Sequence, residues 1–233
     1  MIGAVMVVAG LMLPALSGSR QMARGALSLN NIRQVGLAVF AYGQDHADRP
    51  PALFPPVLVI SPPPWLTVEV DGRSVRGAWF TNDDEFHRLL SPRLPPAVLR
   101  DPSVRSPPDG QADYSIADSF YASPDYWDRA TQRGPAQWQL QAFASVSFPS
   151  LKGLMHQTRV YSVPGHAEYP ACCAAGVRSS VLWADLSAST EDQGALIPGV
   201  PNFFHHGHAS PVALWEGGRP IDDTLHGVRG RDR

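Results

Sequence analysis

This 233-residue chain contains little lysine and little cysteine, and its net charge is small. Lys152 is the only lysine among 19 basic residues, the net charge is −2, and the pI is near 6.4. Such a chain lacks the basic surface that nucleic-acid binding requires, so we expect no nucleic-acid partner. The two cysteines, Cys172 and Cys173, are adjacent, and disulfide geometry disfavours a bond between neighbours. We interpret them as small apolar residues, which say little about the redox compartment.

Signatures of the common enzyme classes are also missing. The sequence has no G-x-S-x-G elbow, no G-x-x-x-x-G-K-[ST] loop, no H-E-x-x-H motif and no G-x-G-x-x-G motif. We therefore expect no enzymatic activity, no catalytic residue and no cofactor. Proline, in contrast, is abundant with 23 residues. Because each proline removes a backbone donor and restricts its neighbour, this content predicts a loop-rich body with short elements.

The first nineteen residues carry no charge, and residues 1–16 read MIGAVMVVAGLMLPAL. As a helix this segment would span about 28 Å, close to the roughly 30 Å hydrocarbon core of a bilayer. Pro14 lies inside the run, and Arg20 and Arg24 follow it. We expect the segment to insert into lipid or to pack on other helices. A cleavable signal peptide ending near residues 15–17 and a buried core helix are the alternatives.

A helical pattern continues beyond this segment. Apolar residues recur at steps of three or four, which marks one face of an α-helix: Leu29, Ile32, Val35, Val39 and Tyr42. Polar residues fall off that face: Arg20, Arg24, Arg33 and Gln44. Gly43 weakens the pattern and Pro50-Pro51 ends it. The sequence predicts one long helix over residues 1–48, apolar at first and amphipathic later, whose second half packs on a globular domain.

The N-terminal fifty residues resemble a known family. The matching elements are Leu13-Pro14-Ala15-Leu16, Arg20, Arg24, Leu29-Asn30-Asn31-Ile32-Arg33-Gln34, Tyr42, His46 and Pro50. In this order they are similar to the N-terminal helix of the prepilin-type, H-x9-D-G family of pseudopilin-like proteins. That family resembles type II secretion and type IV pilin subunits. Its cysteine is Ser28 here, and its Cys-Pro-Ser-like element is Asp101-Pro102-Ser103, so the resemblance implies that a disulfide there is absent.

The C-terminal region carries the second part of the resemblance. Nine residues separate His206 from Glu216-Gly217, which is similar to the H-x9-D-G signature with Glu in place of Asp. Asp185 resembles an Ala-Asp element that the family carries shortly before this histidine. The resemblance implies structural roles for these residues, and we expect His206, Glu216 and Gly217 to form a terminal hairpin.

A metal site is the alternative interpretation of the same region. Imidazole and carboxylate groups are zinc ligands, and His205, His206 and His208 lie in one short stretch with Asp185 upstream. Successive residues of a strand point to opposite faces, so His206 and His208 could share a face while His205 would face away from them. We therefore expect a histidine that bonds the turn backbone, and no metal.

The body of the chain shows weaker signals. Residues 66–70 and 73–80 flank Asp71-Gly72, which predicts a hairpin. Residues 83–90 predict a short capped helix, residues 137–146 a strand or short helix, and residues 159–163 and 179–184 strands. Residues 95–134 are expected to be mostly loop. Their aromatic residues would form either a ligand-facing patch or a small core: Tyr114, Phe120, Tyr121, Tyr126 and Trp127.

Together these patterns predict an α+β fold, with a long N-terminal helix packed on an antiparallel β-sheet that has long proline-rich loops, as in pilins. We divide the chain into a helix (1–48, of which 1–19 is membrane-competent), a proline-rich crossover (49–64) and a β-rich head (65–233). The expected function is a non-enzymatic, pseudopilin-like envelope protein. It would be anchored by a single pass, with its head outside the cytoplasm and residues 1–19 contacting membrane or other pilin-like helices. A carbohydrate- or polymer-binding module and a metal-dependent hydrolase are the alternatives.

Overall fold

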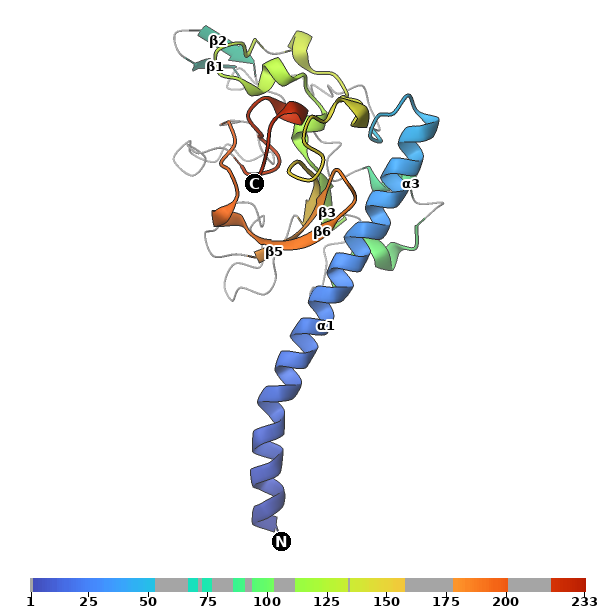
Figure 1. The fold of residues 1–233 in the computed structure, drawn as a ribbon, viewed down its shortest axis with the longest axis vertical. Helices are drawn as coiled ribbons and strands as arrows, with labels where there is room; N and C mark the ends of the chain where they lie inside the picture. The colour runs from blue at the N-terminus through green and yellow to red at the C-terminus, as the bar shows by residue number, and fades with distance from the viewer. Residues whose placement is uncertain are drawn as a thin grey trace.

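A 44-residue helix, α1 (Ile2–Asp45), projects from a β-rich head in the computed structural model (Figure 1). The N-terminus lies at the free end of the helix and the C-terminus lies in the head. The structure describes residues 2–52, 67–70, 73–76, 86–90, 94–102, 112–133, 135–157, 178–200 and 219–233. For residues 2–15 and the first two strands it describes the backbone. The helix continues through Pro14.

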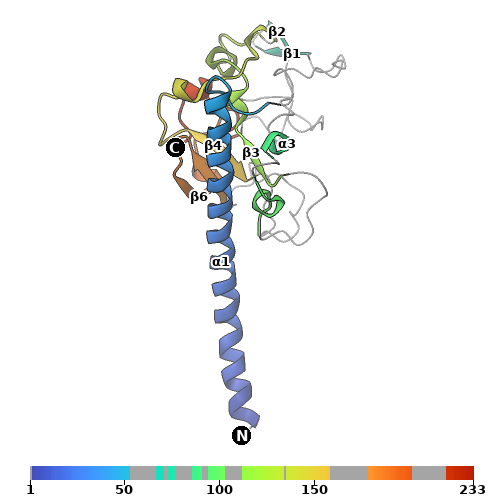
Figure 2. The ribbon, with the colours of Figure 1, turned by 90° about the vertical axis from the view of Figure 1, so that its right-hand side faces the viewer.

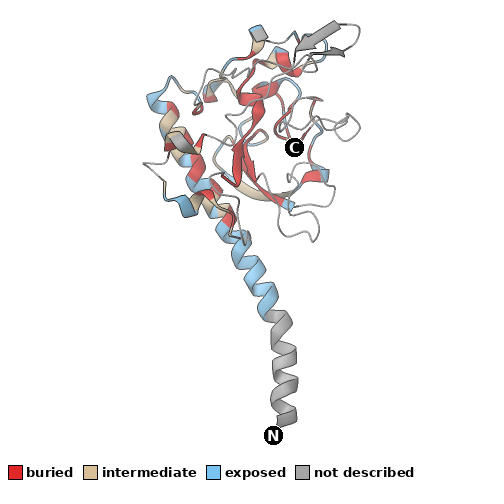
Figure 3. Cartoon of the chain, turned by 180° about the vertical axis from the view of Figure 1, so that it is seen from behind, coloured by how far each residue is buried: buried red, intermediate tan, exposed pale blue. Residues whose placement is uncertain are grey.

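The environment of α1 changes at Ser28 (Figure 3). Residues 16–27 are exposed, whereas the side chains of Ile32, Val35 and Val39 are fully buried. Leu29 and Tyr42 are half-buried, and the polar positions off the predicted face are exposed: Arg20, Arg24, Arg33 and Gln44. The amphipathic second half predicted from the sequence is therefore confirmed.

Four strands form the main sheet of the head, in the order β3-β4-β5-β6 with every neighbouring pair antiparallel. They are β3 (Tyr114–Ile116), β4 (Gly153–Gln157), β5 (Arg178–Trp183) and β6 (Ala188–Asp192). The register pairs Ile116 with Met155 and His156 with Val181. The strand predicted at residues 179–184 is β5. No strand is predicted from the sequence at β3, β4 or β6, and the strand predicted at residues 159–163 lies outside the described residues.

Smaller elements surround this sheet. β1 (Thr67–Val70) and β2 (Arg73–Arg76) form the predicted antiparallel hairpin, with Val70 paired to Arg73. The predicted helix at 83–90 is observed as α3 (His87–Leu90), while residues 82–85 lie outside the described residues. The described part also contains short 3-10 helices at Pro96–Leu99, Asp118–Phe120, Pro124–Trp127, Pro135–Gln137, Phe143–Ser145, Gln193–Ala195 and Gly227–Arg229. Where a strand or short helix is predicted at residues 137–146, the structure has no strand; the range holds the end of the 3-10 helix Pro135–Gln137 and the short 3-10 helix Phe143–Ser145.

The sheet lies between two covering layers. Figure 2 shows α1 running across it, and close packing occurs where Gly36 meets Leu182 of β5. Residues 219–233 cover the opposite face, where Ile221 packs on Gly153 of β4. Both faces of β4 are consequently buried over all five residues. The architecture is α+β, as predicted.

The five aromatic residues of the predicted loop region are at most 1 % exposed: Tyr114, Phe120, Tyr121, Tyr126 and Trp127. They belong to one core with Ile32 and Leu182. The interpretation of these aromatics as a ligand-facing patch is therefore wrong, and the interpretation as a core is confirmed. Their core partners come from α1 and β5, which are distant in sequence. The local sequence alone therefore did not distinguish a ligand-facing patch from a core.

Candidate functional site

A buried polar cluster joins α1 to the head where the helix enters it. Ser28 Oγ donates to Asp101 Oδ2 at 2.8 Å and lies 3.0 Å from Ser180 Oγ of β5. The hydroxyl of Tyr114 on β3 lies 3.2 Å from the same Ser28 Oγ. One turn further along the helix, Asn31 Nδ2 donates to the Arg100 carbonyl at 3.0 Å. These bonds fix the rotation and height of α1 on the sheet, since each one fits a single helix register.

The electrostatics of this cluster keep the Tyr114 phenol neutral. Burial raises the pKa of the Tyr114 phenol well above its usual value of 10.0, and the nearby Asp101 and Asp113 act in the same direction. Tyr114 therefore remains a neutral donor across the physiological range. Because Ser28 and Asp101 are both buried and hydrogen-bonded across the junction of α1 with the head, we assign the cluster a structural role.

The residues of the family signature fall in different places. Asn31 belongs to the junction cluster, whereas Gln34 is exposed on α1. Tyr42 stacks on His46 with ring centroids 3.6 Å apart, and the His46 Nδ1 lies 2.7 Å from the Tyr42 carbonyl. Pro14 lies in the helix segment that is described by its backbone. Among the matched positions of α1 whose side chains the structure describes, Tyr42 and His46 contact each other, while Asn31 and Gln34 lie in different environments.

Asp185 forms the turn between β5 and β6. Its Oδ1 accepts hydrogen bonds from the Ser187 backbone amide at 2.9 Å and from Ser187 Oγ at 2.6 Å. Leu186 between them adopts a left-handed conformation with φ 67. His205, His206, His208, Glu216 and Gly217 lie outside the described residues. Within the described part, no group of three or more His, Cys, Asp or Glu side chains is placed to hold a metal ion.

The first half of α1 is the most exposed apolar feature of the described residues. Leu16, Met22 and Leu27 are 53 %, 72 % and 52 % exposed. They continue the apolar run of residues 1–16, which lies still further from the head (Figure 1). Over the residues that the structure describes, no helix combines the length and hydropathy needed to cross a membrane.

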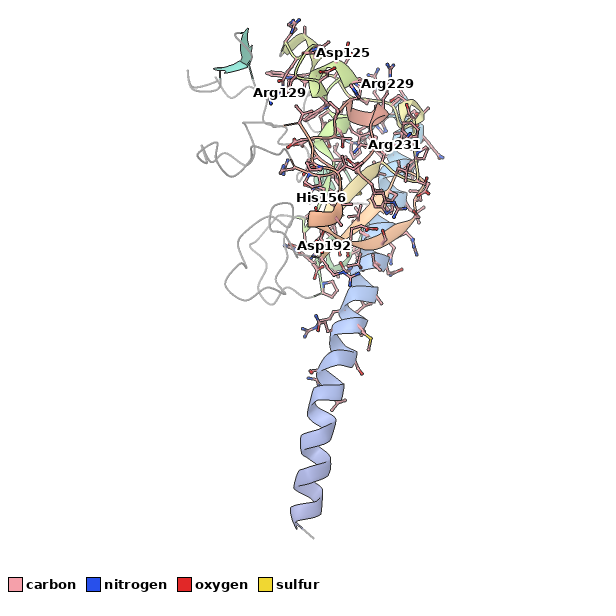
Figure 4. The ribbon with its side chains drawn as sticks, turned by 60° about the vertical axis from the view of Figure 1, so that its left-hand side comes forward. Asp125, Arg129, His156, Asp192, Arg229 and Arg231 are labelled. Carbon is pink, nitrogen blue, oxygen red and sulfur yellow. The ribbon has the colours of Figure 1, made fainter. Side chains whose placement is uncertain are left out.

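A second buried polar cluster lies on the opposite side of the sheet, and sequence reasoning missed it. Arg219 pairs with Asp118 at 2.9 Å and with Asp222 at 3.1 Å. His156 of β4, labelled in Figure 4, lies 2.9 Å from the other oxygen of Asp222. All four side chains are at most 4 % exposed. The pairs offset the cost of burying these charges, and so tie residues 219–233 to β4 and to the Asp118 turn.

Lys152, directly before β4, is buried beside that cluster. Its Nζ donates to Asp232 Oδ2 at 2.7 Å, and both side chains are at most 1 % exposed. Burial lowers the pKa of the Lys152 ammonium, while the charge of Asp232 opposes that shift. The uniqueness of Lys152 was visible in the sequence, but its burial depends on a partner 80 positions away.

Comparison with protein-family models, with curated proteins and with solved structures finds no match to this chain. Functional interpretation therefore starts from two features of the chain itself. One is the exposed first half of α1, and the other is the polar cluster around Ser28 that fixes this helix to the head.

Proposed function

We propose that the chain is a non-enzymatic, pseudopilin-like envelope protein, anchored or assembled through its N-terminal helix and displaying its β-rich head. The observation that carries the proposal is the change along α1 at Ser28, from continuous exposure to core packing. Residues 2–27 would extend about 39 Å as a helix, far more than the head needs for its own core. A helix of that length outside a domain fits a role in attachment.

The chemistry of this extension indicates what it contacts. Residues 1–16 carry no charged side chain, and water disfavours such a surface by about 25 cal/mol for each Å² of apolar area. Lipid chains or the apolar faces of other helices would remove this area from water. We therefore assign residues 1–19 to a membrane or to other pilin-like helices, with the head held in the envelope outside the cytoplasm.

The second half of α1 gives the attachment a fixed geometry. Ile32, Val35 and Val39 are fully buried in the head, and burial of such side chains contributes roughly 1.5–3 kcal/mol each. The Ser28 and Asn31 hydrogen bonds add a specific register. Whatever holds the first half of the helix would thus orient the head as one body with it.

Cell fractionation of full-length variants tests the proposal. Replacing Val7 and Leu11 together by Glu should move the protein from the membrane fraction to the soluble fraction, because charged residues at a helix centre oppose insertion by several kcal/mol. Leu37→Glu is the matched control, since Leu37 is 52 % exposed on the half of α1 that packs on the head. It should leave the distribution unchanged.

Deletion of residues 1–19 provides a second readout. The shortened protein should be soluble and should keep a cooperative thermal unfolding transition, because burial of α1 begins only at Ser28. Equal membrane association of the wild type, the Val7 and Leu11 double variant and the deletion would show that the helix is not the attachment element.

A further inference from the structure

The pair formed by Lys152 and Asp232 has an unusual arrangement of hydrogen bonds. Lys152 Nζ lies 2.7 Å from Asp232 Oδ2 and 2.9 Å from Thr224 Oγ1. It also donates to the Gly153 and Ile221 carbonyls, both at 2.9 Å. As an ammonium, Lys152 has three protons for these four acceptors. After one proton has passed to Asp232, the two remaining protons still serve the Gly153 and Ile221 carbonyls, and the lone pair lies toward the Asp232 carboxyl group. The site therefore accommodates an uncharged amine beside a carboxylic acid.

The two oxygens of Asp232 have different partners. Oδ2 accepts the Gly153 backbone amide at 2.8 Å, and Oδ1 lies 2.6 Å from Thr224 Oγ1. The amide donor is placed to stabilise negative charge on Oδ2, as in an oxyanion hole. Thr224 Oγ1 contacts both the amine and Oδ1, so its hydroxyl bridges the attacking nitrogen and the second carboxyl oxygen.

We propose that Lys152 and Asp232 become joined by an intramolecular amide bond between Nζ and Cγ, with release of one water. The structure supports this through the 2.7 Å approach of the two groups, their complete burial and the separate donors on the two oxygens. The bond would link β4 covalently to residues 219–233, the segment that covers one face of the sheet. This proposal does not rest on the attachment function of α1.

The reaction needs no co-reactant. A proton first moves from the Lys152 ammonium through the Thr224 hydroxyl to Oδ1 of Asp232, which gives an amine and a carboxylic acid with Oδ1 as the hydroxyl. Nζ then attacks Cγ, and the charge that develops on Oδ2 is held by the Gly153 amide. Thr224 passes one proton from Nζ to Oδ1, the Cγ–Oδ1 bond breaks, and Oδ1 leaves as water. Oδ2 remains as the amide oxygen, and no atom is oxidised or reduced.

The surroundings favour this chemistry. Burial lowers the pKa of the Lys152 ammonium, which increases the share of reactive amine. The Phe120 ring lies 5.8 Å from Nζ, and the adjacent Leu154 is fully buried. Exclusion of water from the pocket favours a condensation over the reverse hydrolysis. Arg229 and Arg231, labelled in Figure 4, are exposed, whereas Asp232 of the same segment is fully buried.

Intact mass spectrometry of the purified full chain tests the proposal. The wild type should weigh less than its sequence mass by one water, whereas Lys152→Arg and Asp232→Ala should show their full sequence masses. Cleavage after Arg and Lys should give a branched peptide that joins residues 134–159 to residues 232–233, with no cut after Lys152. This peptide is obtained from the wild type alone, so the test remains decisive if the variants fail to fold.

The single lysine allows an independent count. After unfolding, an amine-reactive label should modify the wild type and Lys152→Arg to the same extent, because the Lys152 amine is already used. A wild type at full sequence mass that takes up one additional label would overturn the proposal and leave a buried ion pair. Thr224→Val should leave a larger unreacted fraction by mass, and an unchanged fraction would overturn the role of Thr224 in passing the proton.

Discussion

Ser28 on α1 donates a hydrogen bond of 2.8 Å to Asp101, which lies 73 positions later in the chain. The structure brings these two positions together, and a hydrogen bond connects them. Ser28 and Asp101 are both 4 % exposed, so the bond is shielded from water. Its contribution to stability should accordingly be larger than that of a surface hydrogen bond.

Ser28→Ala should lower the free energy of unfolding by about 1–3 kcal/mol, because it leaves the buried Asp101 carboxylate without this donor. Denaturant unfolding monitored by circular dichroism measures the change. Ser19→Ala is the matched control on the exposed part of α1, and it should change stability by no more than about 0.5 kcal/mol. Equal effects of the two substitutions would mean that the junction cluster does not stabilise the protein.

Gly36→Ala should destabilise the head by roughly 1–3 kcal/mol, the usual cost of adding a methyl group to a filled core. A Cβ at position 36 would overlap the side chain of Leu182, where α1 crosses β5. Thermal unfolding of the purified protein measures the loss.

Gly25→Ala makes the same chemical change on the same helix without that contact. A Cβ at position 25 meets nothing within 4 Å, so the variant gains helix propensity of up to about 1 kcal/mol. The two substitutions should therefore have opposite signs. Stabilisation by Gly36→Ala would show that α1 does not pack on β5 as described.

The sequence predicted the elements whose signal is local. The apolar residues of α1 recur with the helical period, so Ile32, Val35 and Val39 identified the buried face directly. The turn residues Asp71-Gly72 likewise indicated the β1–β2 hairpin. In both cases one segment carries enough information about its own geometry.

Other parts of the fold depend on partners that are far away in the chain. β4 contains His156, and Lys152 precedes it, so the segment resembles a polar loop until Asp222 and Asp232 are placed against it. Tyr114 lies in the segment that clusters of Asp, Pro, Ser and Gly predict to be loop, and β3, with three residues, is too short to show a strand pattern of its own. The cluster of Arg219, Asp118 and Asp222 has no sequence pattern that distinguishes a buried network from a solvated turn.

Stability at alkaline pH should depend on Tyr114. Its folded pKa is raised by burial above the usual 10.0, so the folded state holds the phenol proton after the unfolded state has released it. The stabilisation is complete below pH 10.0 and is lost as the pH rises further, with a limiting slope of about 1.4 kcal/mol per pH unit.

Denaturant unfolding of the wild type and Tyr114→Phe between about pH 9 and pH 11 measures this slope, since the range brackets the tyrosine pKa. Tyr114→Phe should start from lower stability, because it loses the hydroxyl near Ser28 Oγ, but should fall less steeply with pH. Identical slopes would show that Tyr114 is not buried as a neutral phenol.

Asp185→Ala should lower the free energy of unfolding by about 0.5–1.5 kcal/mol for each hydrogen bond removed from the β5–β6 turn. Asp185→Asn should keep most of the stability, since an amide oxygen can accept the same bonds from the Ser187 backbone and hydroxyl.

A metal ligand would behave differently, because Asn is a weaker ligand than Asp and both variants would lose the ion. Thermal unfolding in zinc and in a chelator separates these cases. We expect the wild type to unfold at the same temperature in both buffers, and Asp185→Asn to unfold at nearly that temperature. A rise in unfolding temperature that needs zinc and occurs in the wild type alone would contradict the turn role.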